Sequence, residues 1–342
     1  MPQENADRSR PTMREVAALA KVSIKTVSRV VNGESGVSPS LARRVMAATE
    51  RLNYRHNMPA SSLRRSDGRS ATIGVVLEDV ANPFSSALHR SIADVASERG
   101  VLVLAASSDE DANRERELVS AFASRRVDGL IIVPAGHDHS YLLSERRAGT
   151  AIVFVDRPPA FLDADTVLTD NEAGMRRGVR HLISHGHKRI GYLGDMQTIA
   201  TAALRYRGYL EELAAHGLQL DEKIVRLGRR GIESAEVATM EIFSGRRPPT
   251  ALITGQNLLT IGAFRALRRL DLLHRVAFVG FDDILLADLL EPGITVIAQD
   301  PAALGRAAAE LLFRRLDGDH SPSAQVVVPT RLITRGSGEV RP

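Results

Sequence analysis

Apolar residues near the start of the chain recur every three or four positions, which is the spacing of one face of a helix. They form three segments, at 12–20, 23–32 and 38–52, and only Lys21 and Val22 separate the first two segments. The pattern predicts a helix, a tight turn, a second helix and then a third helix that closes a small core.

The starts of these segments carry helix-capping signals. Thr12 and Glu15 have the spacing of a capping box, in which the Thr12 hydroxyl accepts from the Glu15 amide and the Glu15 side chain reaches back. Ser23 and Ser38 are good N-cap residues, and Pro39 suits the first position of a helix.

The second helix is expected to bury Val27, Val30 and Val31. Its other faces carry Ile24, Lys25, Thr26, Ser28 and Arg29. The exposed side of this helix is therefore short, polar and cationic.

From Ala71 onward, short β-branched runs alternate with helical stretches, which is typical of a parallel α/β fold. The predicted buried strands are 73–77, 101–104, 130–133 and 152–155 in a first half. A second half repeats the pattern with 190–193, 224–227, 252–254 and 276–279, and a last strand is expected near 331–334. The predicted helices are 85–97, 113–124, 172–184, 201–216, 233–243 and 258–270. We expect two doubly wound subdomains whose facing strand ends form a ligand cleft, in a multidomain chain with an all-α head.

Between the head and the core, residues 59–65 are too few for a stable isolated helix, and 66–70 form a polar boundary. We assign 1–58 to a helix-turn-helix head, 59–70 to a hinge helix and linker, and 71–342 to the core. Within the core, about 71–168 and 300–328 are expected to form the first subdomain, and about 169–299 and 329–342 the second.

Composition agrees with a multidomain chain from a reducing compartment. The chain has 342 residues, 44% of them apolar, which is enough for about two packed domains. Cysteine is absent, which excludes disulfides, thiolate metal sites and cysteine nucleophiles. Residues 1–12 lack the apolar core of a signal peptide and no apolar run is long enough to span a bilayer, so we expect a soluble cytosolic protein without membrane contact.

Charge is distributed unevenly along the chain. Residues 1–66 contain twelve Lys and Arg against five acids, a local net charge of +7, which leaves −3 for the remainder of a chain whose total is +4. A basic head on a mildly acidic body is typical of a nucleic-acid-binding module joined to a second function, although a solvated basic surface gives the same count.

The head resembles that of the lactose-repressor/galactose-repressor family of bacterial regulators. The resemblance rests on "MREVAALAKVSIKTVSRVVNGESGVSPSLARRVMAATERLNYRHN" and continues into "PASSLRR". It implies that the second helix enters the major groove, where residues near its amino end reach base edges. Ile24, Lys25 and Arg29 are then the expected base readers, with Ile24 against a thymine methyl and the two cations on guanine acceptors.

The same resemblance implies two further sets of DNA contacts. Hydroxyl and amide side chains at positions where relatives touch phosphates would set the placement of the head, with helix capping as the alternative or additional role. These residues are Thr12, Ser23, Thr26, Ser28, Asn32, Ser38, Tyr54 and Asn57. In the hinge, Ala60 and Leu63 would enter the minor groove, with Leu63 as the wedge between base steps, unless Leu63 is a linker residue that contacts the body.

The core also resembles this family, whose sensor part is related to periplasmic sugar-binding proteins. The matching stretches are "IGVVLEDVANPF", "FVDRP", "HLISHGHKRIGYLG", "LRYRGY" and "VGFDD". By position, Arg205 would clamp ligand hydroxyls or an acid group, and Asp282 would grip paired hydroxyls. Further polar contacts would come from Asp156, Gln256 and Gln299, and an apolar wall from Phe84. The alternative for Arg205 and Asp282 is a structural salt bridge or helix cap.

Three residues bear on which ligand is expected. Ile232 lies near the position where several sugar-binding members have an aromatic residue, and Gln256 is longer than the side chain in many relatives. Arg229 and Arg230 would suit an acidic or phosphorylated ligand, although two adjacent arginines are more often part of a solvated loop.

Other chemistry is poorly supported by the sequence. His137 and His139, and His181, His185 and His187, do not match a zinc-helix spacing and are interpreted as surface residues, so no metal or cofactor is expected. No phosphate-binding glycine loop or nucleophile elbow occurs, which makes an enzyme the weaker alternative. A transport binding protein is disfavoured by the basic head.

Together these features predict a homodimeric repressor that places two recognition helices on a near-palindromic operator and responds to a sugar-like effector. Release from DNA is the preferred response, with a co-repressor as the alternative. Residues 336–342 show no heptads for a tetramer-forming helix.

Overall fold

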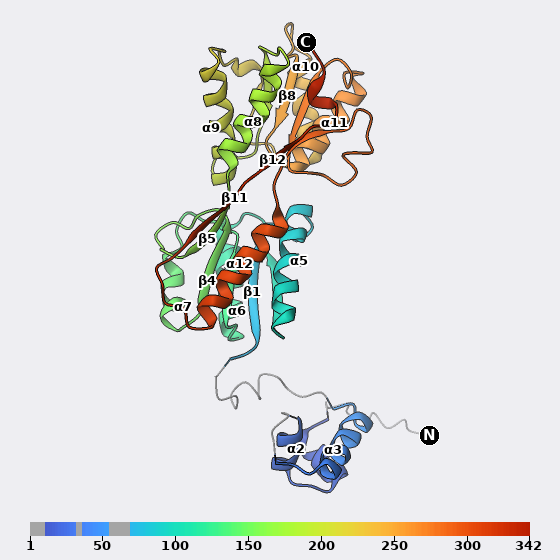
Figure 1. Ribbon diagram of the computed structural model, residues 1–342, viewed down its shortest axis with the longest axis vertical. Coiled ribbons are helices and arrows are strands. Elements are labelled where there is room, and N and C mark those ends of the chain that lie inside the picture. Colours follow the sequence, from blue (N-terminus) through green and yellow to red (C-terminus); the bar gives the residue numbers. More distant parts are fainter. Residues whose placement is uncertain (1–10, 32–35, 55–68) are drawn as a thin grey trace, which may run out of the picture. The chain divides into compact units, whose positions relative to one another are not determined.

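The computed structural model describes residues 11–31, 36–54 and 69–342 (Figure 1). Its contacts divide the chain into two compact units, with the division between Ser70 and Ala71. None of the described helices is both long and apolar enough to cross a membrane.

The described residues of the first unit form three short helices. They are α1 (Met13–Ala20), α2 (Ile24–Val31) and α3 (Pro39–Arg51). Val16, Val27 and Val45, one from each helix, are fully buried against one another. Lys21 ends α1 in the left-handed conformation, with φ of 51°, which allows the chain to turn tightly into α2. The helix-turn-helix prediction is confirmed.

The first subdomain of the second unit is built on a parallel sheet with the strand order β11-β5-β4-β3-β1-β2. The strands are β1 (Thr72–Leu77), β2 (Leu102–Ser107), β3 (Gly129–Ile132), β4 (Ala151–Asp156), β5 (Asp165–Thr169) and β11 (Gln325–Val328). In Figure 1, α5 (Pro83–Glu98) and α12 (Pro301–Leu316) lie side by side on one face of this sheet, where they bury one apolar cluster. The other face is covered by α6 (Ala112–Ser124) and by the segment at α7 (Leu143–Arg147).

The second subdomain repeats this plan with the order β12-β10-β9-β8-β6-β7. Its strands are β6 (Ile190–Leu193), β7 (Val225–Arg226), β8 (Ala251–Thr254), β9 (Ala277–Phe281), β10 (Thr295–Ala298) and β12 (Arg331–Ile333). One face packs on α10 (Ile232–Phe243) and α11 (Asn257–Arg269), and the other face packs on α8 (Asn171–Ser184) and α9 (Ala200–Ala215).

Within residues 69–342 the chain passes between the subdomains three times. The crossings lie between β5 and α8, between β10 and α12, and between β11 and β12. In the first sheet β1 lies between β2 and β3, and in the second sheet β6 lies between β7 and β8. Each sheet therefore has a switch point, where a ligand site is expected at the carboxyl ends of the strands. The fold prediction of two doubly wound subdomains is therefore confirmed.

Several details differ from the sequence-based expectations. The strand expected at 101–104 is not buried: β2 forms the edge of its sheet, and Leu102 is 61% exposed. The second sheet is not wholly parallel, because β12 runs antiparallel to β10. The strand expected at 224–227 is reduced to β7, since Ile224 ends a short 3-10 turn. The elements β5, β10, β11 and α12 were not predicted from the sequence.

Candidate functional sites

The candidate DNA-reading surface is the exposed side of α2. Ile24 is 44% exposed although it is apolar, Lys25 is exposed, and Arg29 is half-buried. The sequence analysis placed Ser28 among the exposed residues of α2, and this was wrong: Ser28 is buried, because it directly follows Val27 at the centre of the three-helix core.

The hydroxyl residues expected at phosphates also cap helices. Thr12 Oγ1 accepts from the Glu15 amide while the Glu15 carboxylate accepts from the Thr12 amide, which completes the capping box. Ser23 Oγ accepts from the Thr26 amide at 3.1 Å, and Ser38 Oγ accepts from the Leu41 amide at 3.4 Å. These side chains are exposed at helix starts, so capping leaves them accessible to a ligand.

Of the other head and hinge residues expected at DNA, the structure describes Tyr54. Tyr54 packs on the core of the head and is half-buried. Asn32, Asn57, Ala60 and Leu63 lie outside the described residues.

All six residues expected at the effector line one polar cavity of about 50 Å³ between the subdomains. They come from six different elements. Phe84 lies on the first turn of α5, Asp156 ends β4, Arg205 lies on α9, Gln256 caps α11, Asp282 follows β9 and Gln299 follows β10. The carboxyl ends of the strands in both sheets therefore face a common space, as the switch-point rule requires.

Two aspartates take equivalent places at the ends of β4 and β9. Asp156 and Asp282 both have left-handed backbones, with φ of 71° and 70°, and both are buried. A non-glycine residue in this region is strained, and such strain is concentrated at ligand sites. Burial raises the pKa of Asp156 above its ordinary value, and the nearby Asp282 and Glu110 add to the rise.

The polar atoms of these aspartates are only partly satisfied. Asp282 accepts from Gln299 Nε2 at 2.6 Å and from the Asn257 amide at 3.2 Å. Among the described residues, no hydrogen-bond partner exists for the buried Asp156 Oδ1 or for the buried Gln299 Oε1. Two acceptors are therefore available in the cavity.

Arg205 is buried and fixed by its surroundings. Its Nε donates to Asn171 Oδ1 and its Nη1 to the Gly255 carbonyl oxygen, both at 2.7 Å. The guanidinium lies 3.9 Å from the centroid of the Phe281 ring. The structural role expected as an alternative for Arg205 is thus present, and it also holds the side chain at the cavity wall.

Sequence reasoning missed a cluster of charged residues at the edge of this cavity. Glu78, Glu110 and Asp195 line it, and Arg157 donates to both oxygens of Glu110, at 2.7 and 2.6 Å. Each of these carboxylates lies within three residues after a strand, next to β1, β2 and β6. That position is the signal that could have identified them.

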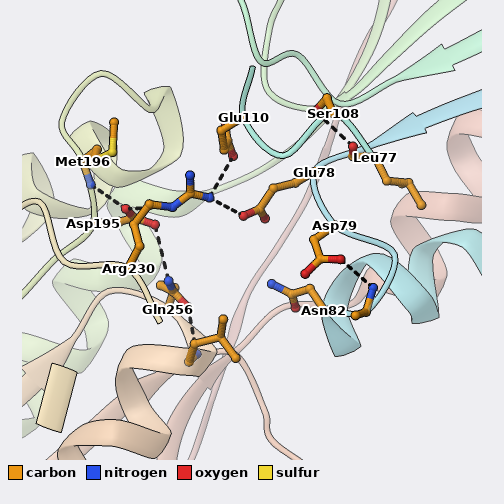
Figure 2. A network of polar contacts seen from close by, with 12 residues as sticks. Leu77, Glu78, Asp79, Asn82, Ser108, Glu110, Asp195, Met196, Arg230 and Gln256 are labelled. Atoms are coloured by element: carbon orange, nitrogen blue, oxygen red, sulfur yellow. Dashed lines mark hydrogen bonds and ion pairs between the residues drawn. The ribbon is translucent and has the colours of Figure 1, made fainter. Parts of the chain in front are cut away.

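Arg230 joins this cluster from the second subdomain. Figure 2 shows its guanidinium between three carboxylates: Nη2 lies 2.5 Å from Glu78 and 3.8 Å from Glu110, and Nε lies 3.6 Å from Asp195. Burial and the adjacent Glu110 raise the pKa of Glu78 to about 7. This geometry fits neither of the two roles expected for Arg230, a solvated loop residue or a cation free to bind an acidic ligand.

Gln256 lines the polar cavity, and two contacts hold its side chain there. Gln256 Oε1 accepts from the Leu258 amide at 2.8 Å, and Gln256 Nε2 reaches Asp195 at 3.4 Å, so both ends of the side chain are in use. Ile232 begins α10 and does not line the cavity; Ile199 does.

A second cavity of about 250 Å³ adjoins the first and shares Glu110, Arg157 and Ile199 with it. Most of the other lining residues are apolar or small. They are Pro134, Ala135, Gly136, His137, Pro158, Pro159, Ala160, Met196, Thr198 and Ala200.

The expectation of surface histidines holds for His137, which is exposed, but is wrong for His139 and His187. His139 and His187 are buried, and burial lowers the pKa of each below its ordinary value. His187 bonds the Val340 carbonyl at 2.7 Å and His181 bonds Glu339 at 2.6 Å, so both hold the C-terminal segment against the second subdomain.

Comparison with known proteins agrees with this architecture. Residues 12–57 match the family described as "Bacterial regulatory proteins, lacI family", and residues 179–338 match the "Periplasmic binding protein-like domain". The HTH-type transcriptional regulator CelR of Thermobifida fusca is 32% identical, over 97% of this chain and 99% of its own.

Solved structures show the same similarity. A structure of the lac repressor dimer bound to operator and the anti-inducer ONPF has a TM-score of 0.84 at 27% identity, covering 96% of this chain and 99% of its own. A complex of the transcriptional regulator CelR with cellobiose has a TM-score of 0.71 at 30% identity, covering 96% and 100%.

A helix-turn-helix head joined to a two-lobed core with a polar cleft defines a ligand-responsive DNA-binding regulator. The chain belongs to the lacI family of bacterial regulatory proteins.

Proposed function

We propose that the protein is a cytoplasmic, homodimeric repressor of carbohydrate-uptake or catabolic genes, released from a near-palindromic operator by a sugar-like effector. The observation that carries the proposal is that all six effector residues expected from the sequence line one cavity between the subdomains. The proposal assigns the protein no catalytic role.

On DNA, α2 enters the major groove. Lys25 and Arg29 donate to guanine acceptors and the exposed Ile24 packs on a thymine methyl. Thr12, Ser23, Thr26 and Ser38 bind phosphates from helix starts, and Leu63 of the hinge enters the minor groove. The lac repressor dimer, whose fold this chain shares, has been solved bound to operator.

In the cleft, a hydroxyl-bearing ring fits the chemistry of the polar cavity. The unsatisfied Asp156 Oδ1 and Gln299 Oε1 accept from ligand hydroxyls, while Arg205 donates and Phe84 supports the apolar face of the ring. CelR, similar along nearly its whole length, has been solved with cellobiose.

The effector acts by preferring one arrangement of the two subdomains. Three chain crossings connect them, so they can change their relative orientation while each sheet stays intact. The effector shifts operator affinity only by its differential affinity for the two arrangements, typically about 1–3 kcal/mol.

A symmetric dimer would cover apolar residues that the core leaves exposed. Leu102, Leu285 and Leu289 are 61%, 86% and 74% exposed. The lac repressor used for comparison is itself a dimer.

The test is selection of bound DNA from a pool of random duplexes at moderate salt, using the full-length protein. We expect recovery of a near-palindromic site, and loss of that site in Lys25→Ala and Leu63→Ala. Binding without any motif that merely weakens with salt would show a non-specific basic head and contradict the proposal. A motif recovered only after a ligand mixture is added would replace release by co-repression.

A further inference from the structure

We infer that the effector is an uncharged molecule of two parts: a hydroxyl-rich ring in the polar cavity and a second, less polar unit in the adjoining 250 Å³ cavity. Glycosides, disaccharides and nucleosides have this chemistry. Sugar acids, sugar phosphates and single free rings do not. The inference rests on the proposed effector function and narrows its ligand class.

Three buried atoms that line the polar cavity lack hydrogen-bond partners among the described residues. Asp156 Oδ1 and Gln299 Oε1 are acceptors, and the third atom, the donor Arg157 Nε, lies 3.4 Å from Asp156 Oδ2 in an ion pair. A buried acceptor is costly until a donor reaches it. A hydroxyl or N–H group supplies that donor, and a carboxylate or phosphate oxygen does not.

Carboxyl groups outnumber arginines around the polar cavity. The polar cavity is lined by five carboxylates, Glu78, Glu110, Asp156, Asp195 and Asp282, and by two arginines, Arg157 and Arg205. Arg157 is paired with both oxygens of Glu110, and Arg230 reaches Glu78 and Asp195 from the edge. An anionic ligand would meet more carboxyl groups than cations, and Arg157 and Arg230 are already paired with carboxylates, which disfavours its binding.

The adjoining cavity has a largely apolar wall. Its wall contains Pro134, Pro158, Pro159, Met196 and Ile199, which offer apolar surface and few hydrogen bonds. Apolar pockets with a few polar groups at one end are typical of sites that bind an amphipathic ligand.

The two cavities border each other. Glu110, Arg157 and Ile199 line both, so a ligand placed among Asp156 and Gln299 has its second unit directed past these three residues. The polar cavity alone, at about 50 Å³, is far below the roughly 300–1,000 Å³ of ordinary ligand pockets, which favours use of both cavities.

One feature of the second cavity would favour an anionic ligand. The amino end of α9, at Ala200, borders the second cavity, and helix amino ends attract anions. Glu110 lines the same cavity and opposes this attraction. Phosphate derivatives are therefore the decisive comparison.

The experiment is isothermal titration of the full-length protein with matched sets of probes. Each set contains a free aldose, two uncharged two-part derivatives of it and a phosphate ester. One set is glucose, cellobiose, phenyl β-glucoside and glucose 6-phosphate, another is ribose, uridine, adenosine and ribose 5-phosphate, and galactose and mannose supply the same forms. In at least one set we expect a two-part member to bind at least tenfold more tightly than the free aldose, and the phosphate ester to bind most weakly.

Two variants locate the second unit. Ala200→Phe places a large side chain at the wall of the second cavity, and Ala215→Phe makes the same change at the far end of the same helix, away from both cavities. We expect Ala200→Phe to abolish the tenfold advantage while affinity for the free aldose changes less than twofold, and Ala215→Phe to change neither.

Equal affinity for the free aldose and its two-part form, tightest binding of a phosphate ester, absence of binding by every two-part probe, or equal effects of the two variants would each overturn the inference. Selection of operator DNA without ligand is independent of these titrations. A protein that selects an operator but fails the titration test retains the proposed DNA function and loses only this ligand class.

Discussion

Arg230 Nη2 lies 2.5 Å from Glu78 Oε1, and this ion pair joins the second subdomain to the first at the edge of the polar cavity. The pair contains residues 152 positions apart in the sequence. Glu110 and Asp195 lie close to the same guanidinium, so one cation offsets carboxylates from both sides of the cleft (Figure 2). Changes to this pair should therefore report on how the subdomains hold together.

The first prediction is a favourable coupling between Arg230 and Glu78. Both side chains are partly exposed, at 34% and 25%, so solvent screening limits the coupling to about 0.5–1 kcal/mol. The measurement is a double-mutant cycle of Arg230→Gln and Glu78→Gln at pH 8, using urea unfolding followed by tyrosine fluorescence.

Arg229→Gln is the control for that cycle. Arg229 lies on the same loop but approaches only Glu241 of its own subdomain, at 3.8 Å. We expect no coupling between Arg229→Gln and Glu78→Gln. Equal couplings for the two arginines would show that the effect is general electrostatics and not the pair across the cleft.

The second prediction concerns pH. The folded protein binds a proton at Glu78 near pH 7, whereas the unfolded chain does so near 4.5, because burial and Glu110 outweigh the attraction of Arg157 and Arg230. Between these values the folded state carries more bound protons, so the contribution of Glu78 to stability is present at low pH and is lost as pH rises through 7.

Glu78→Gln removes this titration. We expect the stability of the variant relative to the parent to increase by roughly 1–3 kcal/mol between pH 5.5 and pH 8, measured by urea unfolding. Asp156 and Asp195, whose pKa values are also raised by burial, titrate in both proteins, so only the difference between them is interpreted. A difference that does not change with pH would contradict the assignment.

The pattern of the sequence was sufficient for the helices of the head and for most strands of the core. Buried strands such as β1 and β8 are continuous apolar runs, and Thr12, Ser23 and Ser38 mark helix starts through chemistry confined to a few residues. β11 was missed because it is an edge strand with alternating exposure, and β5 because it begins with the buried Asp165, whose partner Arg315 is distant in sequence.

The cleft was predicted in part for the same physical reason. Asp156 and Asp282 were identified because they follow strands within stretches that resemble the family. Arg230 was misread because its partners Glu78 and Glu110 belong to the other subdomain, and no local spacing encodes a pairing that only the tertiary fold creates. The buried state of Ser28 likewise follows from the packing of three helices and not from the pattern of α2 alone.

The third prediction separates the buried Arg205 from the exposed Arg207 on the same helix. Arg205→Met leaves Asn171 Oδ1 and the Gly255 carbonyl without their donor, which should lower the free energy of unfolding by about 2–4 kcal/mol. Arg207 is 57% exposed and paired with Glu172, so Arg207→Met should lower the free energy of unfolding by only about 0–1 kcal/mol. Urea unfolding of both variants provides the comparison, and equal losses would show that Arg205 is not fixed by these bonds.

The last prediction concerns base reading by α2. Lys25→Ala should weaken binding to the selected operator by about 10- to 100-fold and relax the preference at one base pair, since a good contact to guanine discriminates by roughly 1–3 kcal/mol. Arg43→Ala removes the same charge from an exposed position on α3, so it should weaken binding to all sequences alike and reduce the salt dependence by about one unit of slope. Fluorescence anisotropy with the operator and its single-base variants measures both effects. If Lys25→Ala also weakened every sequence equally, Lys25 would be a phosphate contact, and the reading of bases would then depend on Ile24 and Arg29.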